Sequence, residues 1–573
     1  MVLLSLSEID LADLFRVRSC VTRRFLLATV LVTTSCTTAA QTQPDAGRLM
    51  QDQQRLQFPE PTRRAVLPRL EPQVPAESTA PDSARVRVQA IRFSGNTLFE
   101  TATLAALLVD LIGQELDLAG LDVAAARVTA FYRQQGYFVA QAILPAQQIT
   151  DGSVEIAVLE GRLGTLTVDN RSSLPPALTQ AYLNGLQAGQ PLSGPALERA
   201  LLLMIDVPGT AVASTLMPGA SFGTTDLDVR LTSLAPVSGR AGIDNYGNRY
   251  TGALRPGVQA SIHGPLSLGD ALSVQGYLSD GDYRYARLAW QLPVGSLGWQ
   301  AGVAWSSMAY RLGLDFASLD AHGTADIASL YALYPLQRSR VANVSLQINL
   351  DHKRQIDRTD SLGISTERRA QVLNLGVSGD LTDGLAGGGV STWSLAHASG
   401  RLQLDPTTSV LDALGHRTAG GYGKWLATGA RQQTVDLPVR GWSVMAQASA
   451  QFADKNLDSS EKMSLGGIQG VRAYPQGEAA CDDALLVNLD LRYALADGWL
   501  LSGFYDAAAG RLNHSPIEAD AGNRQRLRGA GLGLGYSRSG LAVSTALAWR
   551  NGPVPLSDHD RNPRLWLNVQ TYF

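Results

Sequence analysis

The chain has 573 residues, of which 17% are charged and 56 are glycines, and its formal net charge is -3. Few charges with abundant glycine are unusual for a soluble enzyme, and the small net charge gives no sign of a nucleic-acid partner. No stretch after residue 40 has eighteen consecutive apolar residues, which excludes transmembrane helices from the mature chain. The length predicts several domains rather than one.

The first 40 residues have the pattern of an export signal. Arginines up to Arg24 precede the apolar run 25–32, and Thr38-Ala39-Ala40 offers a cleavage site of small residues. We therefore expect a signal peptide at 1–40, with a lipoprotein site at Cys36 as the alternative. Once the signal is removed, Cys481 is the one cysteine left, so no intrachain disulfide is expected.

The next two segments predict a short helix and a tether. In residues 41–58, Leu49 and Leu56 lie a heptad apart among polar residues that favour a helix. Taken alone, this pattern also fits a frayed surface helix. Residues 59–84 hold six prolines, which predicts an extended, solvated linker.

Residues 85–162 show a compact α/β pattern. A strand, two helices and two strands are predicted at 86–94, 98–112, 121–134, 139–144 and 154–159. Asp151-Gly152 between the last two strands is typical of a hairpin turn.

Residues 163–233 repeat the same order. The predicted strand, two helices and two strands lie at 163–168, 175–186, 195–205, 213–217 and 227–231. Exposed edges of such sheets are ready docking surfaces for an extended polypeptide.

From residue 234 onward, apolar and polar residues alternate. Leu297–Ser306, Val344–Asp351 and 564–573 each have a period of two, which is the mark of a strand between lipid and a wet lumen. The 340 residues 234–573 therefore predict a transmembrane antiparallel β-barrel with tilted strands of about ten residues.

A glycine-rich segment, residues 453–484, interrupts this pattern between strands at 442–452 and 485–495, and it carries a central Arg472. Spacing alone also fits an ordinary extracellular loop. In the strand that follows, alternation over 499–506 places Trp499, Leu501, Gly503 and Tyr505 toward lipid and Leu500, Ser502, Phe504 and Asp506 toward the lumen.

Several motifs resemble those of one family. Three segments resemble the sequence motifs of POTRA domains: Phe93-Ser-Gly-Asn96, Tyr132–Tyr137 and Leu159-Glu160-Gly161. Val471, Arg472, Ala473 and Tyr474, with Gly477 and Glu478, resemble the inward-folded loop of two-partner secretion transporters (the TpsB or ShlB/FhaC/HecB family, relatives of BamA-type insertases). Phe504-Tyr505-Asp506 resembles that family's F-x-D-x-G strand motif, although Ala508 replaces its glycine and Gly510 follows two residues later.

The resemblance implies two periplasmic α/β POTRA domains, 85–162 and 163–233, followed by a sixteen-stranded barrel at 234–573 in the bacterial outer membrane. It also implies that helix 41–58 plugs the pore and that loop 453–484 folds inward, with Arg472 pairing with Asp506. A wet lumen is expected to screen that pair. Phe573, the terminal aromatic residue, resembles the C-terminal signal read by the barrel assembly machinery.

The expected function is secretion of a large exoprotein of the haemagglutinin or haemolysin type, recognised by the POTRA domains and conducted by the barrel. An outer-membrane insertase is the alternative within the superfamily. An outer-membrane enzyme or passive porin is the alternative outside it.

Catalytic and metal-binding motifs do not appear in the sequence. The 7 histidines are scattered, with no H-E-x-x-H, G-x-S-x-G or phosphate-binding pattern. No enzyme activity, cofactor or metal is therefore expected, and Asp357–Asp360 and Asp482-Asp483 are interpreted as solvated loop charges.

Overall fold

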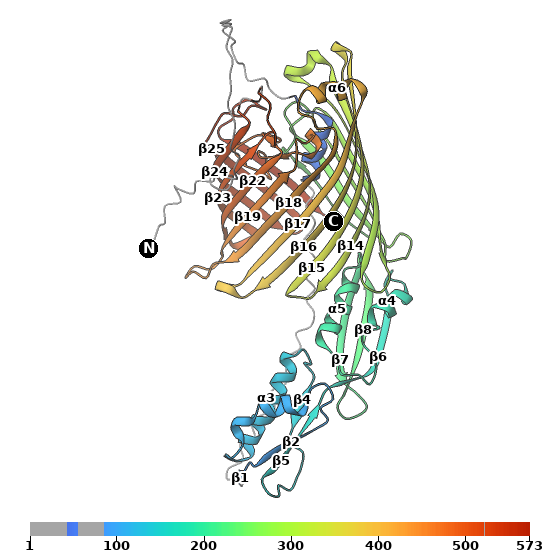
Figure 1. The fold of residues 1–573 in the computed structure, drawn as a ribbon, viewed down its shortest axis with the longest axis vertical. Helices are drawn as coiled ribbons and strands as arrows, with labels where there is room; N and C mark the ends of the chain where they lie inside the picture. Colours follow the sequence, from blue (N-terminus) through green and yellow to red (C-terminus); the bar gives the residue numbers. More distant parts are fainter. Residues whose placement is uncertain (1–42, 56–84, 519, 521) are drawn as a thin grey trace, which may run out of the picture. The chain divides into compact units, whose positions relative to one another are not determined.

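Sixteen antiparallel strands close into one barrel in the computed structural model, which describes residues 43–55, 85–518, 520 and 522–573 (Figure 1). The predicted signal peptide 1–40, the whole of the predicted linker 59–84 and both ends of the predicted helix 41–58 lie outside the described residues. Neighbouring strands pair in sequence order, β19 pairs with β22, and β26 closes the ring on β9. The barrel prediction is therefore confirmed.

The strands of the first half of the ring are β9 Val237–Asp244, β10 Arg255–His263, β11 Ala271–Leu278, β12 Asp282–Val294, β13 Trp299–Arg311, β14 Ala321–Arg338, β15 Ala342–Thr359 and β16 Ile364–Asp383. Those of the second half are β17 Gly389–Leu404, β18 Gly420–Thr434, β19 Trp442–Ala453, β22 Asp483–Ala494, β23 Trp499–Arg511, β24 Arg524–Arg538, β25 Leu541–Arg550 and β26 Arg564–Tyr572.

Most barrel strands are longer than the predicted ten residues, and three neighbours are the longest: β14 and β15 have 18 residues each, and β16 has 20. The added length lies beyond the apolar band, because the outward face of β15 carries exposed His352, Arg354 and Arg358 at that end. Charged side chains on the outward face require water rather than lipid. The expected length was sufficient to cross the membrane but did not account for this extension.

The predicted alternation holds on β23. Trp499 and Tyr505 are 42% and 43% exposed on the outer face, whereas Phe504 and Asp506 are 6% and 0% exposed on the inner face. Inner and outer faces therefore follow the period-two pattern that the sequence shows.

The first α/β domain has the predicted order with two local differences. Strand β2 Ala90–Ser94 pairs parallel with β5 Ser153–Leu159, which pairs antiparallel with β4 Gln141–Ile143, and α3 Leu118–Gln134 contributes several buried side chains to the core. The predicted helix 98–112 is instead α2 Thr101–Ala106 followed by a 3-10 turn, Val109–Leu111, which keeps Leu108 and Leu111 on the buried side. The predicted first strand is split, and β1 Val86–Arg87 pairs with β3 Glu115–Leu116.

Glu160 fixes the end of this domain's sheet. Its side chain is 1% exposed and accepts hydrogen bonds from the backbone N–H of Thr97 at 2.6 Å and of Leu98 at 2.7 Å. The Tyr132 hydroxyl donates a third at 3.3 Å. One carboxylate thus satisfies two backbone donors that follow β2.

Glu160→Ala is expected to destabilise the domain by about 1–3 kcal/mol, because it leaves buried donors without acceptors. Chemical denaturation of a soluble fragment, residues 85–233, measures the loss, and Glu155→Ala on the exposed face of β5 is the control. Equal midpoints for the two variants would contradict this role of Glu160.

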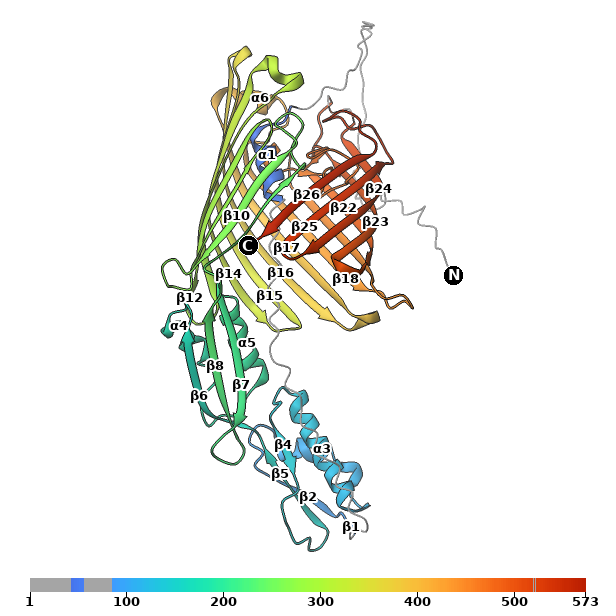
Figure 2. The ribbon, with the colours of Figure 1, turned by 180° about the vertical axis from the view of Figure 1, so that it is seen from behind.

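The second α/β domain repeats the order of the first (Figure 2). Its elements are β6 Arg162–Arg171, α4 Pro176–Leu183, α5 Gly194–Ile205, β7 Thr210–Pro218 and β8 Thr224–Ser233. Central β8 pairs parallel with β6 and antiparallel with β7, and the domain has its own apolar core. Each domain can therefore bury its apolar side chains independently.

Two α-helices of the described chain lie outside these domains: α1 Ala46–Arg55 and α6 Pro406–Leu414. Helix α1 contacts the wall strands β13, β14 and β15 and the segment that joins β19 to β22, and Figure 2 shows it among the barrel strands. In the part of the chain that the structure describes, no helix combines the length and apolarity needed to span a membrane.

Candidate functional site: the occupied barrel lumen

The segment between β19 and β22 folds against the inner wall of the barrel. Its β20 Met463–Ser464 and β21 Ala480–Cys481 form a small antiparallel pair. Leu465, Val471 and Tyr474 are each 0% exposed, and they share a core with inward side chains of β22 to β25. We call residues 454–482 the lumen loop.

Arg472 joins the lumen loop to two wall strands. Its Nη2 lies 2.6 Å from Asp506 Oδ1 on β23, and its Nη1 lies 2.9 Å from Asp490 Oδ1 on β22. The Arg472 backbone N–H also donates to Asp506 Oδ2 at 3.0 Å. The structure therefore brings together the two residues that the sequence pairs, and it adds a second carboxylate.

Further groups surround this arginine. The Phe504 ring centroid lies 3.6 Å from its Cζ, which is a cation–π contact. Asn488 Nδ2 donates to Asp506 Oδ1 at 2.8 Å and to the Gly470 carbonyl at 2.9 Å. The roles of Asn488 and Asp490 were not predicted, although both lie on the polar face of their strand.

The Arg472 cluster is buried, which corrects the expectation that a wet lumen screens it. The side chains of Asp506, Asp490 and Arg472 are 0%, 9% and 14% exposed. Burial opposes the charge of Arg472, but hydrogen bonds and charges from Asp506 and Asp490 outweigh it and raise the pKa of Arg472 above its ordinary value. Breaking such a pair costs about 3–5 kcal/mol, whereas an exposed and screened pair contributes only about 1 kcal/mol or less.

The other residues of the loop motif have structural contacts. Ala473 is 2% exposed and packs on Gly529 of β24, and the Tyr474 hydroxyl donates to the Pro553 carbonyl at 3.0 Å. Glu478 accepts from the backbone N–H groups of Leu556 and Ser557 at 2.9 and 3.0 Å.

Two glycines and one alanine of the two motifs, Gly477, Gly510 and Ala508, differ in how much space the fold leaves for a side chain. Gly477 has a φ of +82°, in the region that favours glycine, and a Cβ there would meet Asp52 of α1. At Gly510 a Cβ would lie 2.7 Å from the Asp483 carbonyl. Ala508 packs in the buried core, so the barrel accommodates alanine where the family motif has glycine.

Asp482 and Asp483 are not solvated loop charges, which corrects that prediction. They are 0% and 2% exposed. Lys462 Nζ lies 3.2 Å from Asp482, and Arg511 Nη2 lies 2.9 Å from Asp483. Asp357 is likewise an inward wall residue that pairs with Arg368, whereas Asp360 is exposed.

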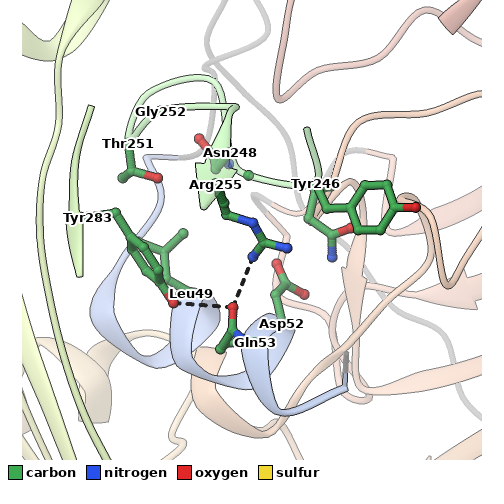
Figure 3. Close-up of a pocket in the computed structure, with 11 residues that line it drawn as sticks. Leu49, Asp52, Gln53, Tyr246, Asn248, Thr251, Gly252, Arg255 and Tyr283 are labelled. Carbon is green, nitrogen blue, oxygen red and sulfur yellow. Dashed lines mark hydrogen bonds between the residues drawn. The ribbon is translucent and has the colours of Figure 1, made fainter. Parts of the chain in front are cut away.

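Helix α1 is held in the lumen through both polar and apolar contacts. Gln53 Oε1 accepts from Arg255 Nη1 of β10 at 2.9 Å and from the Tyr283 hydroxyl of β12 at 3.5 Å, and Figure 3 shows Gln53 between the two. Asp52 accepts from the Ser464 hydroxyl of the lumen loop at 2.8 Å. Apolar contacts come from Ala46, Leu49 and Met50, which share a buried cluster with tyrosine, methionine and aliphatic side chains on the barrel side.

The terminal aromatic residue closes the barrel seam. The Phe573 backbone N–H donates to the Gly239 carbonyl at 3.0 Å, and the Phe573 carbonyl accepts from the Gly239 N–H at 2.9 Å, while Phe573 is 60% exposed.

Among the described residues, no group of three or more His, Cys, Asp and Glu side chains could hold a metal ion.

The sequence matches two family models. The model for haemolysin secretion/activation protein ShlB/FhaC/HecB matches residues 223–536, and the model for the ShlB-type POTRA domain matches residues 86–161. The first match covers more than half of the chain.

Relatives and solved structures agree with these matches. The heme/hemopexin transporter protein HuxB of Haemophilus influenzae is 27% identical over 487 residues, which is 82% of this chain and 84% of that protein. The outer membrane transporter CdiB of an Escherichia coli strain is 26% identical over 496 residues, covering 84% and 83%. The fold resembles a solved CdiB structure from Escherichia coli, with a TM-score of 0.68 at 22% identity over 88% of this chain and 93% of that one.

The chain therefore belongs to the haemolysin secretion/activation protein family ShlB/FhaC/HecB, and it is an outer-membrane transporter with periplasmic POTRA domains that secretes a partner exoprotein.

Proposed function

We propose that this structure is the closed state of the transporter. Helix α1 and the lumen loop occupy the lumen, and a large exoprotein of the haemagglutinin or haemolysin type passes in extended form once they give way. The observation that carries the proposal is the buried contact of Arg472 with Asp506 and Asp490, which ties a loop to a lumen wall that must be clear during transport.

The nature of the contacts supports reversible displacement. Gln53 with Arg255, Asp52 with Ser464 and Asp45 with Arg368 are hydrogen bonds and ion pairs that side chains can exchange for water or for groups of a passing chain. The apolar contacts of Ala46, Leu49 and Met50 are the part of the interface that has no such replacement. The secreted protein's folding outside the cell then makes its return unfavourable.

The POTRA domains are proposed to receive the cargo by strand addition. Strand β7 is an edge of its sheet, and its residues Ala213, Thr215 and Met217 are exposed. An open edge offers backbone donors and acceptors to an extended segment. We expect a soluble fragment of residues 85–233 to bind the cargo's N-terminal domain with a micromolar Kd, as a small transient interface does.

Ala213→Lys/Thr215→Lys tests the edge, because lysines on an edge strand oppose addition of another strand. The double variant is expected to weaken binding about tenfold in isothermal titration. Thr232→Lys, exposed on central β8, is the matched control and should bind like the unchanged fragment. If a folded fragment shows no binding at all, recognition does not lie in these domains.

A further inference from the structure

Two lysines of the barrel wall hold one carboxylate of the lumen loop. Lys353 Nζ on β15 lies 2.6 Å from Glu461 Oε1, and Lys424 Nζ on β18 lies 2.9 Å from Glu461 Oε2. Lys424 also donates to the Glu461 carbonyl at 2.7 Å. All three side chains are less than 10% exposed.

The two lysines depend on the loop for this partner. Within the described residues, Glu461 is the one carboxylate at ion-pair distance from either lysine. Asp351, a neighbour on β15, accepts hydrogen bonds from Ser329 and Asn349 instead. Displacement of the lumen loop removes this partner and exposes both ammonium groups to the lumen, where they can bind another anion.

Arg368 on β16, the strand next to β15, repeats the arrangement. It lies 3.3 Å from Asp45, just before α1, and 3.1 Å from Asp458 of the lumen loop, and its wall partner is Asp357. At Arg368 a wall cation thus holds one carboxylate of the wall and two carboxylates from the parts that must move.

The choice of lysine is informative. The sequence contains four lysines among 48 basic residues, and two of them form this site. Arginine binds a carboxylate through a rigid, bidentate fork, whereas lysine is a strongly hydrated point charge with rotatable donors. Lysine therefore suits contacts that form and break repeatedly. Arg472, by contrast, provides the directional contact that holds the loop.

We propose that Lys353 and Lys424, with Arg368 beside them, form a carboxylate-binding stripe on the lumen wall that contacts acidic side chains of the passing polypeptide. In the closed state Glu461, Asp458 and Asp45 occupy this stripe in place of the cargo. This inference rests on the proposed closed state.

Glu461 retains its charge in the site. Burial opposes ionisation, but Lys353 and Lys424 outweigh it and lower the pKa of Glu461 to about 2. A depressed pKa means that the contact is present above the ordinary range of a glutamate and is lost only as the pH falls toward 2. Glu461 is therefore charged at neutral pH and holds both lysines as a carboxylate.

The test uses the full chain in planar bilayers, with a polyglutamate peptide of about twenty residues added on the POTRA side. Glu461→Gln is expected to raise the frequency of open events and to make polyglutamate block the current at a concentration at least about tenfold lower than polylysine. The triple variant Glu461→Gln/Lys353→Gln/Lys424→Gln should open as often but lose this preference. Glu461→Gln/Lys455→Gln, which removes a lysine outside the stripe, should keep it.

In the Glu461→Gln background, Lys353→Arg/Lys424→Arg is expected to prolong each polyglutamate block severalfold, because a guanidinium group binds a carboxylate through a bidentate fork. Equal block of the Glu461→Gln and triple variants would overturn the stripe and leave the lysines as a fastening for the loop. A failure of the transport proposal appears separately, as absence of cargo secretion by the unchanged protein in cells.

Discussion

Arg472→Ala is expected to reduce secretion of the partner exoprotein at least about tenfold while the barrel remains inserted in the membrane. The substitution leaves Asp506 and Asp490, whose side chains are 0% and 9% exposed, without the cation that lies between them. Removing one partner of a buried pair costs about 3–5 kcal/mol, because the remaining charge is left uncompensated. The loop then loses the defined closed position from which it opens for the cargo, so a loss of secretion is expected rather than freer passage. Secreted cargo in the culture medium is the measurement, with heat-modifiability of the barrel as the test of folding.

The Arg472 cluster also predicts an order among its variants. Asp506→Ala should be nearly as severe, whereas Asp490→Ala should be milder, since Arg472 then retains its bidentate contact with Asp506. The double variant Arg472→Ala/Asp506→Ala should lose little more than Arg472→Ala alone. Arg401→Ala, at an exposed position of β17, is the control. Fully additive losses would show that the two side chains act independently.

Deleting residues 43–55 is expected to raise the single-channel conductance at least about twofold, because an α-helix with its side chains is about 10–12 Å across and α1 occupies the lumen. The barrel should remain folded, since the described strands close without any contribution from α1. Conductance in planar bilayers measures the effect.

A deletion of equal length within residues 59–84 controls for shortening the chain ahead of the POTRA domains and should leave the conductance unchanged. If the deletion of 43–55 also leaves it unchanged, α1 does not obstruct the pore. The lumen loop would then be the sole obstruction to consider.

Local patterns predicted most of the fold because each one is repeated along the chain. Period-two alternation identified the barrel, and two successive β-α-α-β-β units identified the α/β domains. The split of the first strand and the 3-10 turn at Val109–Leu111 were missed, because such short elements depend on tertiary contacts rather than on periodicity. The insertase and porin alternatives are not favoured, since the matching family is one of secretion proteins.

The site was predicted in part. Arg472 and Asp506 could be paired because a motif resemblance and strand alternation pointed to the same lumen. Asp490 could have been added from the same alternation, since it shares the inward face of β22.

Neither a motif nor strand alternation indicated that Asp482 and Asp483 would be buried. Two adjacent aspartates after a glycine-rich segment resemble a solvated turn, and only the fold of the lumen loop brings Lys462 and Arg511 beside them. The Lys353–Glu461–Lys424 contact has the same origin, because its members lie on β15, on β18 and in the loop. Long-range charge pairing of this kind is set by the barrel's closure rather than by any local pattern.

A disulfide between the lumen loop and the wall tests most directly whether the loop must move. A Cβ added at Gly529 lies 2.5 Å from that of Ala473, so the loop needs to shift by about 1 Å to reach disulfide geometry. Ala473→Cys/Gly529→Cys in a Cys481→Ser background should secrete no cargo when oxidised and recover when reduced, whereas neither single-cysteine variant should respond to reductant. Equal secretion by the oxidised and reduced double variant would show that cargo passes without displacement of the loop, and would contradict the proposed closed state.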